Sequence, residues 1–121
     1  MLWVLATLLG VCTAGVAAED RAYTRTEDVI YGRVDGTALT MDVFRPERPN
    51  GLGVVYAISG GWYSAHVFIN FKFRQPLLNH GYTVFAVVHG SNPRFHIPEI
   101  VGQMDRAVRF IRVHAADYAI D

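Results

Sequence analysis

The sequence predicts an α/β fold in which an antiparallel hairpin is followed by parallel strands with crossover helices. Two β-prone runs flank the dipeptide Asp35-Gly36, a pattern typical of a hairpin turn. Two later runs, residues 54–58 and 82–88, are almost continuously apolar, which is typical of parallel strands buried on both faces. Helical segments between and after these runs give the strand and helix alternation of a parallel sheet.

The hairpin is expected to comprise residues 29–34 and 39–44. The second run alternates apolar and polar side chains, as a strand with one buried face does. Residues 45–51 combine Pro, Gly and charged side chains, so they are expected to form a loop.

A crossover helix is expected between the two apolar strands, over residues 64–80. Pro76 should break or kink this helix and leave a short C-terminal turn from Leu77, because proline cannot donate the backbone hydrogen bond that a helix interior needs. Gly81 then suits the left-handed residue that ends a helix. Strand, helix and strand together predict a right-handed parallel unit.

The strongest helical pattern begins at Pro98, a residue type favoured at the first turn. Asp105 and Arg109 have the spacing of a favourable pair on its polar side. The neighbouring arginines, Arg106 and Arg112 with Arg109, are expected to form a solvated face in preference to an anion site. An apolar stripe at spacings of three and four should face the core: Ile100, Met104, Ala107, Val108, Ile111 and Ala115.

Composition excludes several classes of protein. Eleven Lys and Arg balance eleven Asp and Glu, so the basic excess that nucleic acid or anionic membrane would require is missing. A hydrophobic content of 51% is typical of a globular chain and not of a disordered one. Cys12 is the only cysteine and lies in the apolar leader, so neither a disulfide nor a thiolate metal site is expected in the folded part. No cofactor is expected.

The first eighteen residues carry no charged side chain. An apolar run leads to Val16-Ala17-Ala18 and then to acidic residues, the pattern of a secretory signal cleaved after about Ala18. We therefore expect residues 1–18 to be a signal peptide and residues 19–121 to be a secreted or periplasmic domain with no stable membrane association. An uncleaved membrane anchor is the alternative.

The segment Ser59-Gly60-Gly61-Trp62-Tyr63 follows the first apolar strand. Two glycines at this place allow backbone N–H groups to converge on one point, which is what a developing oxyanion needs. A tight strand-to-helix turn without chemistry is the alternative interpretation.

The order of elements and this loop resemble the N-terminal part of the α/β-hydrolase fold, in particular its secreted carbohydrate-esterase and hormone-sensitive-lipase-like branch. Those enzymes carry a His-Gly-Gly-Gly-Trp type loop after the third strand, whose amides help to form the oxyanion hole. Gly60 and Gly61 match the last two glycines and Trp62 the aromatic residue, whereas Ile58 and Ser59 replace the histidine and the first glycine. The resemblance implies oxyanion-hole N–H groups at Gly60 and Gly61.

The same resemblance extends to most of the mature chain. Phe95 and Pro98 match the aromatic residue and the proline that precede the family's next helix. It implies that Trp62 lines the substrate pocket, with ordinary packing at a helix start as the alternative role. It also implies that the substrate is a small-molecule or carbohydrate ester, hydrolysed by acyl transfer.

The nucleophile elbow of this family, Gly-x-Ser-x-Gly, does not occur in the 121 residues. The resemblance therefore implies a truncated domain that supplies the oxyanion loop of a serine esterase while the triad lies beyond it. In the family, the next strand would pair beside residues 54–58. Without it, we expect the strand at residues 54–58 to form an open edge of the sheet. A non-catalytic binding module and a non-functional remnant are the alternatives.

Other polar residues are expected to have structural roles. Ser59 and Ser64 should brace turns, Asp42 should pair across strands, and His89 and Ser91 lie too close in sequence to form a catalytic pair. The remaining histidines are dispersed without the pairing or carboxylate neighbours of a zinc site, so surface or loop positions are expected: His66, His80, His96 and His114.

Overall fold

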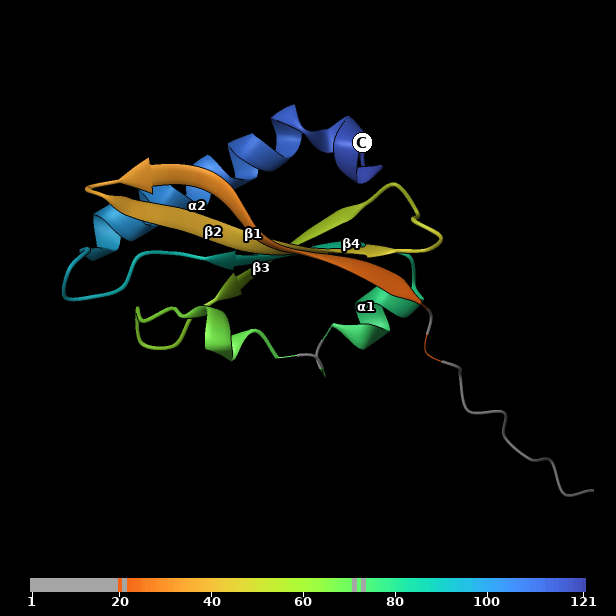
Figure 1. Cartoon of the computed structure of the whole chain (residues 1–121), viewed down its shortest axis with the longest axis horizontal. Coiled ribbons are helices and arrows are strands. Elements are labelled where there is room, and N and C mark those ends of the chain that lie inside the picture. The colour runs from red at the N-terminus through yellow and green to blue at the C-terminus, as the bar shows by residue number, and fades with distance from the viewer. Residues whose placement is uncertain (1–19, 21, 71, 73) are drawn as a thin grey trace, which may run out of the picture.

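The computed structural model describes residues 20, 22–70, 72 and 74–121. These residues form a sheet in the order β1-β2-β4-β3, with α2 against one face and the short segments η1 and α1 against the other (Figure 1). The elements are β1 (Tyr23–Val34), β2 (Thr37–Pro46), β3 (Gly53–Ile58), η1 (His66–Phe68), α1 (Gln75–Asn79), β4 (Thr83–Val88), α2 (Ile97–Val113) and η2 (Ala115–Tyr118).

The segment predicted to be a signal peptide, residues 1–18, lies outside the described residues. Within the part of the chain that the structure describes, we find no helix with the length and apolar character needed to cross a membrane.

The predicted hairpin is confirmed. Asp35 and Gly36 both have positive φ angles, +47° and +75°, as the two central residues of a tight hairpin turn require. The expected loop begins later than predicted, because β2 continues to Pro46, which pairs with Tyr23. Proline is tolerated there because the end of a strand needs no further ladder donor.

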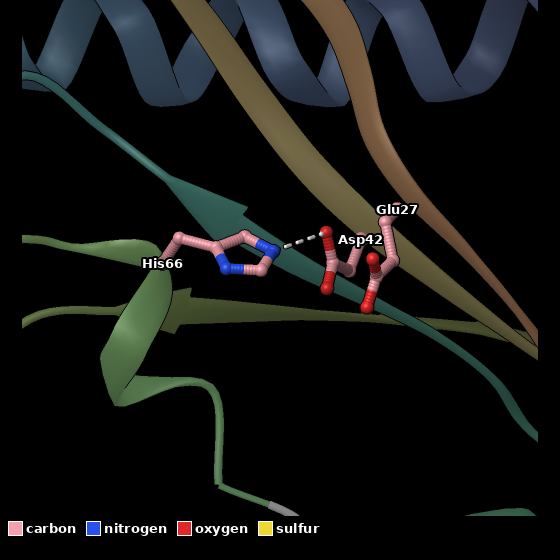
Figure 2. Close-up of side chains that lie close together, drawn as sticks. All are labelled: Glu27, Asp42 and His66. Carbon is pink, nitrogen blue, oxygen red and sulfur yellow. Dashed lines mark hydrogen bonds and ion pairs between the residues drawn. The ribbon is translucent and has the colours of Figure 1, made fainter.

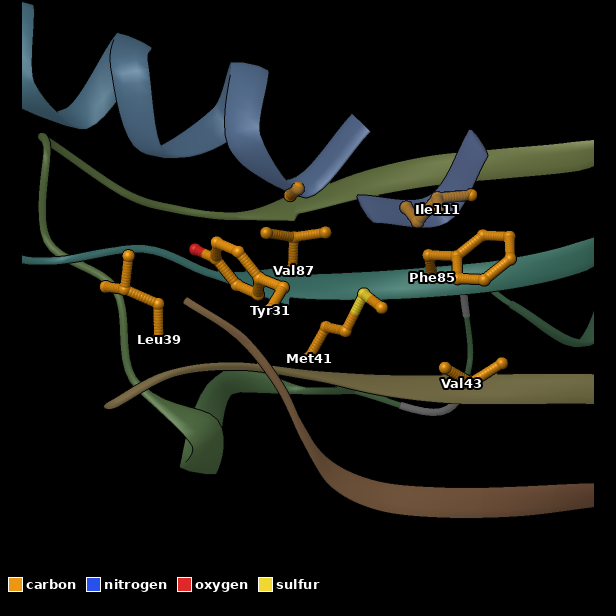
Figure 3. Close-up of a cluster of buried hydrophobic side chains, with 8 residues drawn as sticks. Tyr31, Leu39, Met41, Val43, Phe85, Val87 and Ile111 are labelled. Atoms are coloured by element: carbon orange, nitrogen blue, oxygen red, sulfur yellow. The ribbon is translucent and has the colours of Figure 1, made fainter. Parts of the chain in front are cut away.

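Strand β4 is buried on both faces, as predicted. It pairs antiparallel with β2 and parallel with β3, and its residues Val84, Phe85, Ala86 and Val87 are fully inaccessible to solvent. Phe85 and Val87 contribute to the core beneath α2 (Figure 3). Val84 and Ala86 contribute to a second core, with Phe44, Ile58 and Leu78, on the α1 side. Alternation along a single strand therefore supplies both cores.

Strand β3 differs from the prediction that residues 54–58 are covered on both faces. It lies at the edge of the four-stranded sheet, and Val55 and Tyr56 are 39% and 37% exposed. The expected open edge is thus what the structure shows. The apolar sequence indicated burial, but no described strand flanks the outer side of β3 apart from a short bridge between Gly51 and Ile120.

The crossover helix expected over residues 64–80 is also wrong in extent. The structure has the short η1 and the five-residue α1 there. The predicted break at Pro76 with a short turn after it is borne out, because α1 is a separate five-residue helix. Pro76 lies in its first turn, where the missing N–H costs nothing, so proline starts this helix and does not kink a longer one. Gly81 follows with a φ of +87°, as predicted for a helix end.

Helix α2 is confirmed, with Pro98 in its first turn and a capping box between His96 and Glu99. Arg109 was expected to pair with the Asp105 carboxylate. Its Nε instead donates to the backbone carbonyl of Asp105 at 3.5 Å. The predicted apolar stripe faces the sheet, and its buried members are Ile100, Ala107 and Ile111. The polar residue Gln103 is buried beside them, which the apolar periodicity did not indicate.

Two glycine substitutions test this account of the backbone. Gly81→Ala should lower the free energy of unfolding by about 2 kcal/mol, because alanine is strained at positive φ and its Cβ would lie 2.9 Å from the Arg48 carbonyl oxygen. Gly102→Ala is the matched control, since its Cβ meets no atom within 4 Å in α2, and it should raise stability by about 1 kcal/mol. Urea denaturation followed by circular dichroism measures both. Equal effects of the two substitutions would contradict the assigned helix end.

Candidate functional site

The glycine loop forms a tight turn directly after β3. Gly60 N–H donates to the Tyr63 carbonyl at 2.9 Å, and Tyr63 N–H donates back to the Gly60 carbonyl at 3.1 Å. Gly61 and Trp62, between them, have φ angles of +59° and +62°. Glycine adopts this conformation without strain, whereas Trp62 is held in it by the closed turn.

Ser64 fixes this turn to the neighbouring strand, which confirms its predicted bracing role. Its hydroxyl donates to the Ile58 carbonyl and accepts the His89 N–H at 3.2 Å, so it bridges the ends of β3 and β4. The Ser91 hydroxyl accepts the Ser64 N–H and donates to the Ser64 carbonyl, both at 2.9 Å. The loops that follow β3 and β4 are therefore locked together.

The two glycine amides that were predicted to bind an oxyanion lie together at the carboxyl end of β3. Gly60 N–H is engaged by Tyr63. Gly61 N–H forms no hydrogen bond within residues 20, 22–70, 72 and 74–121, and it is exposed. A Cβ at either glycine would meet no atom within 4 Å, so the space above both is open.

A cavity of about 330 Å³ lies beside the loop. Trp62, predicted to line the substrate pocket, is 44% exposed at the top of the turn and does not line this cavity. Tyr63 and Phe68 take that place, with an edge-on ring contact at a centroid distance of 6.0 Å. Phe68 was not predicted there because residues 64–80 were expected to form one longer helix, and no local spacing indicated Tyr63. The cavity is lined by Tyr56, Ala57, Ile58, Ser59, Gly60, Tyr63 and Phe68.

His89 and Ser91 do not form a catalytic pair, as predicted. His89 Nδ1 donates to the Gly90 carbonyl at 2.6 Å, and Ser91 is engaged with Ser64. Gly90 N–H donates at 2.6 Å to the side-chain oxygen of buried Gln103, which explains why α2 places a polar residue toward the sheet. This loop is structural.

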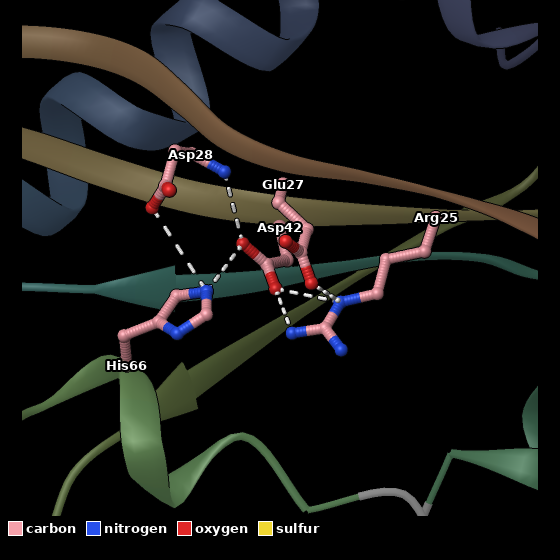
Figure 4. A network of polar contacts seen from close by, with 5 residues as sticks. All are labelled: Arg25, Glu27, Asp28, Asp42 and His66. Carbon is pink, nitrogen blue, oxygen red and sulfur yellow. Dashed lines mark hydrogen bonds and ion pairs between the residues drawn. The ribbon is translucent and has the colours of Figure 1, made fainter.

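Asp42 is the centre of a polar network beneath the sheet (Figure 4). Its carboxylate is fully buried and accepts hydrogen bonds from Arg25 Nε at 2.9 Å, Arg25 Nη2 at 2.5 Å and Asp28 N–H at 3.1 Å. The predicted pairing across strands is thus confirmed. His66 Nε2 lies 3.1 Å from the same carboxylate, so the expectation that His66 lacks carboxylate neighbours is wrong. Folding brings η1 back beneath the hairpin, which no local spacing indicated.

Three residues of this network could hold a metal ion. Ligand atoms of Glu27, Asp42 and His66 lie within 4.8 Å of one another (Figure 2). Arg25, however, contacts both carboxylates, with Glu27 at 3.2 Å, and its positive charge occupies the position of a cation. In this arrangement the cluster is an ion-pair network that ties η1 to β1 and β2.

A second arginine lies close to the network. Arg74 is 1% exposed and stacks over the Phe44 ring, with its guanidinium carbon 4.2 Å from the ring centroid. Burial lowers the pKa of Arg74, and the positive charge of Arg25 acts in the same direction. A cationic side chain therefore reinforces the core between the hairpin and α1, an arrangement that sequence periodicity did not indicate.

The other histidines have local roles, as expected. Nδ1 of His80 lies 2.7 Å from the Pro76 carbonyl, Nδ1 of His114 lies 2.8 Å from the Phe110 carbonyl, and His96 caps α2.

Solved structures that share this architecture include esterases. A truncated form of a carbohydrate esterase from gut microbiota matches with a TM-score of 0.71 and 23% identity, over 85% of this chain and 38% of its own. A hyperthermophilic esterase from the archaeon Pyrobaculum calidifontis matches at 0.69 and 24%, over 86% and 33%. An arylesterase matches at 0.67 and 19%, over 86% and 36%. No family model and no curated protein matches the sequence.

These matches confirm the fold predicted from the sequence. The chain has the fold of the N-terminal part of an α/β-hydrolase, and its mixed sheet corresponds to that part of the esterases. It spans little more than a third of the length of these structures.

A serine substitution tests the brace beneath the turn. Ser64→Ala removes the hydroxyl that bridges Ile58 and His89, so the free energy of unfolding should fall by about 2 kcal/mol, the range for buried groups left without partners. Ser59→Ala is the matched control, because Ser59 flanks the same turn but is exposed, and it should change stability by less than about 0.5 kcal/mol. Similar losses in the two variants would show that Ser64 does not brace the loops.

Proposed function

We propose that this chain is the front part of a secreted serine esterase that hydrolyses carboxylic esters by acyl transfer. The observation that carries the proposal is the Gly60-Gly61 turn, with one uncommitted amide, at the carboxyl end of a parallel strand, where α/β proteins place their ligands. The shared fold of the esterases supports the reaction class. The chain is proposed to supply the oxyanion loop, and the nucleophile, acid and histidine are proposed to lie beyond it.

The chemistry assigned to the loop is electrostatic. When a serine attacks an ester carbonyl, negative charge develops on the carbonyl oxygen, and preorganised N–H donors stabilise it. Gly61 is proposed as the main donor because the residue is exposed and its N–H has no hydrogen-bond partner among the described residues, while the Gly60 N–H holds the turn through Tyr63. The left-handed backbone of Trp62 is in keeping with this role, because such strain clusters at functional sites.

The outer edge of β3 supports the proposal that the catalytic serine follows on a further strand. The Leu52 carbonyl points toward β4 and accepts a hydrogen bond from Thr83 N–H. Because successive carbonyls along an extended chain point in opposite directions, the Gly51 carbonyl points away from β4. That carbonyl accepts Asp121 N–H at 2.9 Å, and Ile120 pairs with Gly51 in the parallel sense. A strand continuing in this register would pair along β3 and end beside Gly61.

The substrate is proposed to be a small-molecule or carbohydrate-linked ester. The cavity beside the loop offers aromatic side chains, Tyr63 and Phe68, against which an acyl group or a sugar ring can pack, with Trp62 at its rim. Secretion is proposed from the leader at residues 1–18. No nucleic acid is proposed as a partner, because the charge is balanced.

Sequencing the encoding DNA downstream of the Asp121 codon tests the proposal, followed by expression of the continuous frame. A Gly-x-Ser-x-Gly motif within a few tens of codons, with turnover of p-nitrophenyl esters by the product, is the expected result. A stop codon directly after Asp121 with a stable, monomeric 121-residue product that melts cooperatively would overturn it in favour of a non-catalytic binding module.

Substitutions at Gly60 in the longer product test the oxyanion loop. Gly60→Pro removes the N–H that closes the turn and so displaces the Gly61 donor that the turn positions. Loss of that donor should lower kcat about 10²- to 10³-fold with a much smaller change in KM. Gly60→Ala keeps that N–H and its Cβ meets no atom within 4 Å, so it should retain kcat within about threefold. Unchanged turnover in the proline variant would refute the assignment of this loop.

A further inference from the structure

A second cavity, of about 480 Å³, lies between α2 and β1. Because β1 and β3 are at opposite edges of the sheet, a strand added at β3 would not cover this cavity. It is therefore separate from the glycine loop, and its occupation does not depend on the proposed esterase reaction. Its lining residues are Tyr31, Gly102, Arg106, Arg109, Phe110, Val113 and His114.

Arg106 and Arg109 bring positive charge to one wall. They are three residues apart on α2, so their side chains emerge on the same side of the helix. Neither guanidinium forms an ion pair with any residue among 20, 22–70, 72 and 74–121. The field of Arg106 reaches into the cavity: burial raises the pKa of Tyr31, and the charge of Arg106 opposes that rise.

Glycines hold this wall open. A Cβ at Gly32 on β1 would lie 2.6 Å from Cδ of Arg106, so the absence of a side chain there lets the stem of Arg106 lie across the strand. Gly102 presents open space at the other end, despite the cost of a glycine within a helix. Both residues increase the room around the guanidinium groups.

The opposite part of the cavity is apolar and flat. Phe110 and His114 stack with a centroid distance of 4.1 Å and an interplanar angle of 25°. Val113 beside them is 81% exposed. An aromatic ring packed here would remove exposed apolar surface from water.

We propose that this cavity binds a small aromatic carboxylate. Planar guanidinium groups match the geometry of a carboxylate, and the adjacent apolar wall accommodates the ring that carries it. Inorganic phosphate has the charge but no apolar body, so it would use only half of the site. The solvated arginine face expected from the sequence thus becomes one wall of a ligand site.

Titration of the expressed continuous frame that contains these 121 residues with 2-naphthoate, followed by ligand-detected NMR, tests the proposal. Binding of 2-naphthoate, with at least tenfold weaker binding of neutral 2-naphthamide and of inorganic phosphate, is the expected result. Equal binding of the amide would overturn the role of the arginines, and equal binding of phosphate would overturn the role of the apolar wall.

Three arginine variants locate the site. Arg106→Gln and Arg109→Gln should each weaken naphthoate binding about tenfold, the effect of losing one charge-assisted contact. Arg112→Gln removes the same charge from the same helix but lies outside the cavity, so it should change binding less than about twofold. Equal loss in all three would show non-specific attraction and refute the site.

Gly32→Ala keeps every charge and provides a second, independent variant. Its Cβ should displace Arg106 and weaken naphthoate binding several-fold. Thermal melts by circular dichroism are the control that checks whether each variant retains the fold. Unchanged affinity in a folded Gly32→Ala protein would contradict the placement of Arg106 at the site.

Discussion

The pairing of β4 with β2 on one side and β3 on the other is the constraint on which the rest of the structure depends. Because β4 contributes to both cores, α2 and α1 can pack on opposite faces of the same strand. Its parallel pairing with β3 brings the carboxyl ends of both strands to one edge. Ser64 can then bridge Ile58 and His89, and this bridge gives the glycine turn a fixed position.

The network around Asp42 anchors the same loop from the other end. A fully buried carboxylate is unfavourable unless its charge and hydrogen-bonding capacity are satisfied. The Arg25 guanidinium supplies the opposite charge, and the Asp28 N–H and the His66 ring supply further hydrogen bonds. Because His66 belongs to η1, the compensation also attaches the segment after the glycine turn to the hairpin. The turn is therefore held by hydrogen bonds to β4 and by an ion-pair network to β1 and β2.

Net charge conceals how the charges are distributed. The eleven positive and eleven negative side chains cancel in total, yet acidic groups gather near Asp42. Two guanidinium groups that form no ion pair within the described part of the chain lie between α2 and β1. A balanced sum excludes binding of polyanions by bulk attraction. It does not exclude a local site, because a cavity with two arginines acts at short range on a small ligand.

The sequence by itself determined the hairpin, the apolar strands, helix α2 and the glycine turn, because turn chemistry and periodicity are local properties of the chain. Only the tertiary structure decided that β3 is an edge, that η1 reaches Asp42, and that Gln103 is buried to bind Gly90. The same holds for the arginine cavity and for the hydrogen bond from the Gly60 N–H to Tyr63, whereas the Gly61 N–H has no partner in the part of the chain that the structure describes. These features join residues far apart in the chain, or depend on backbone angles, and neither spacing nor composition encodes such contacts.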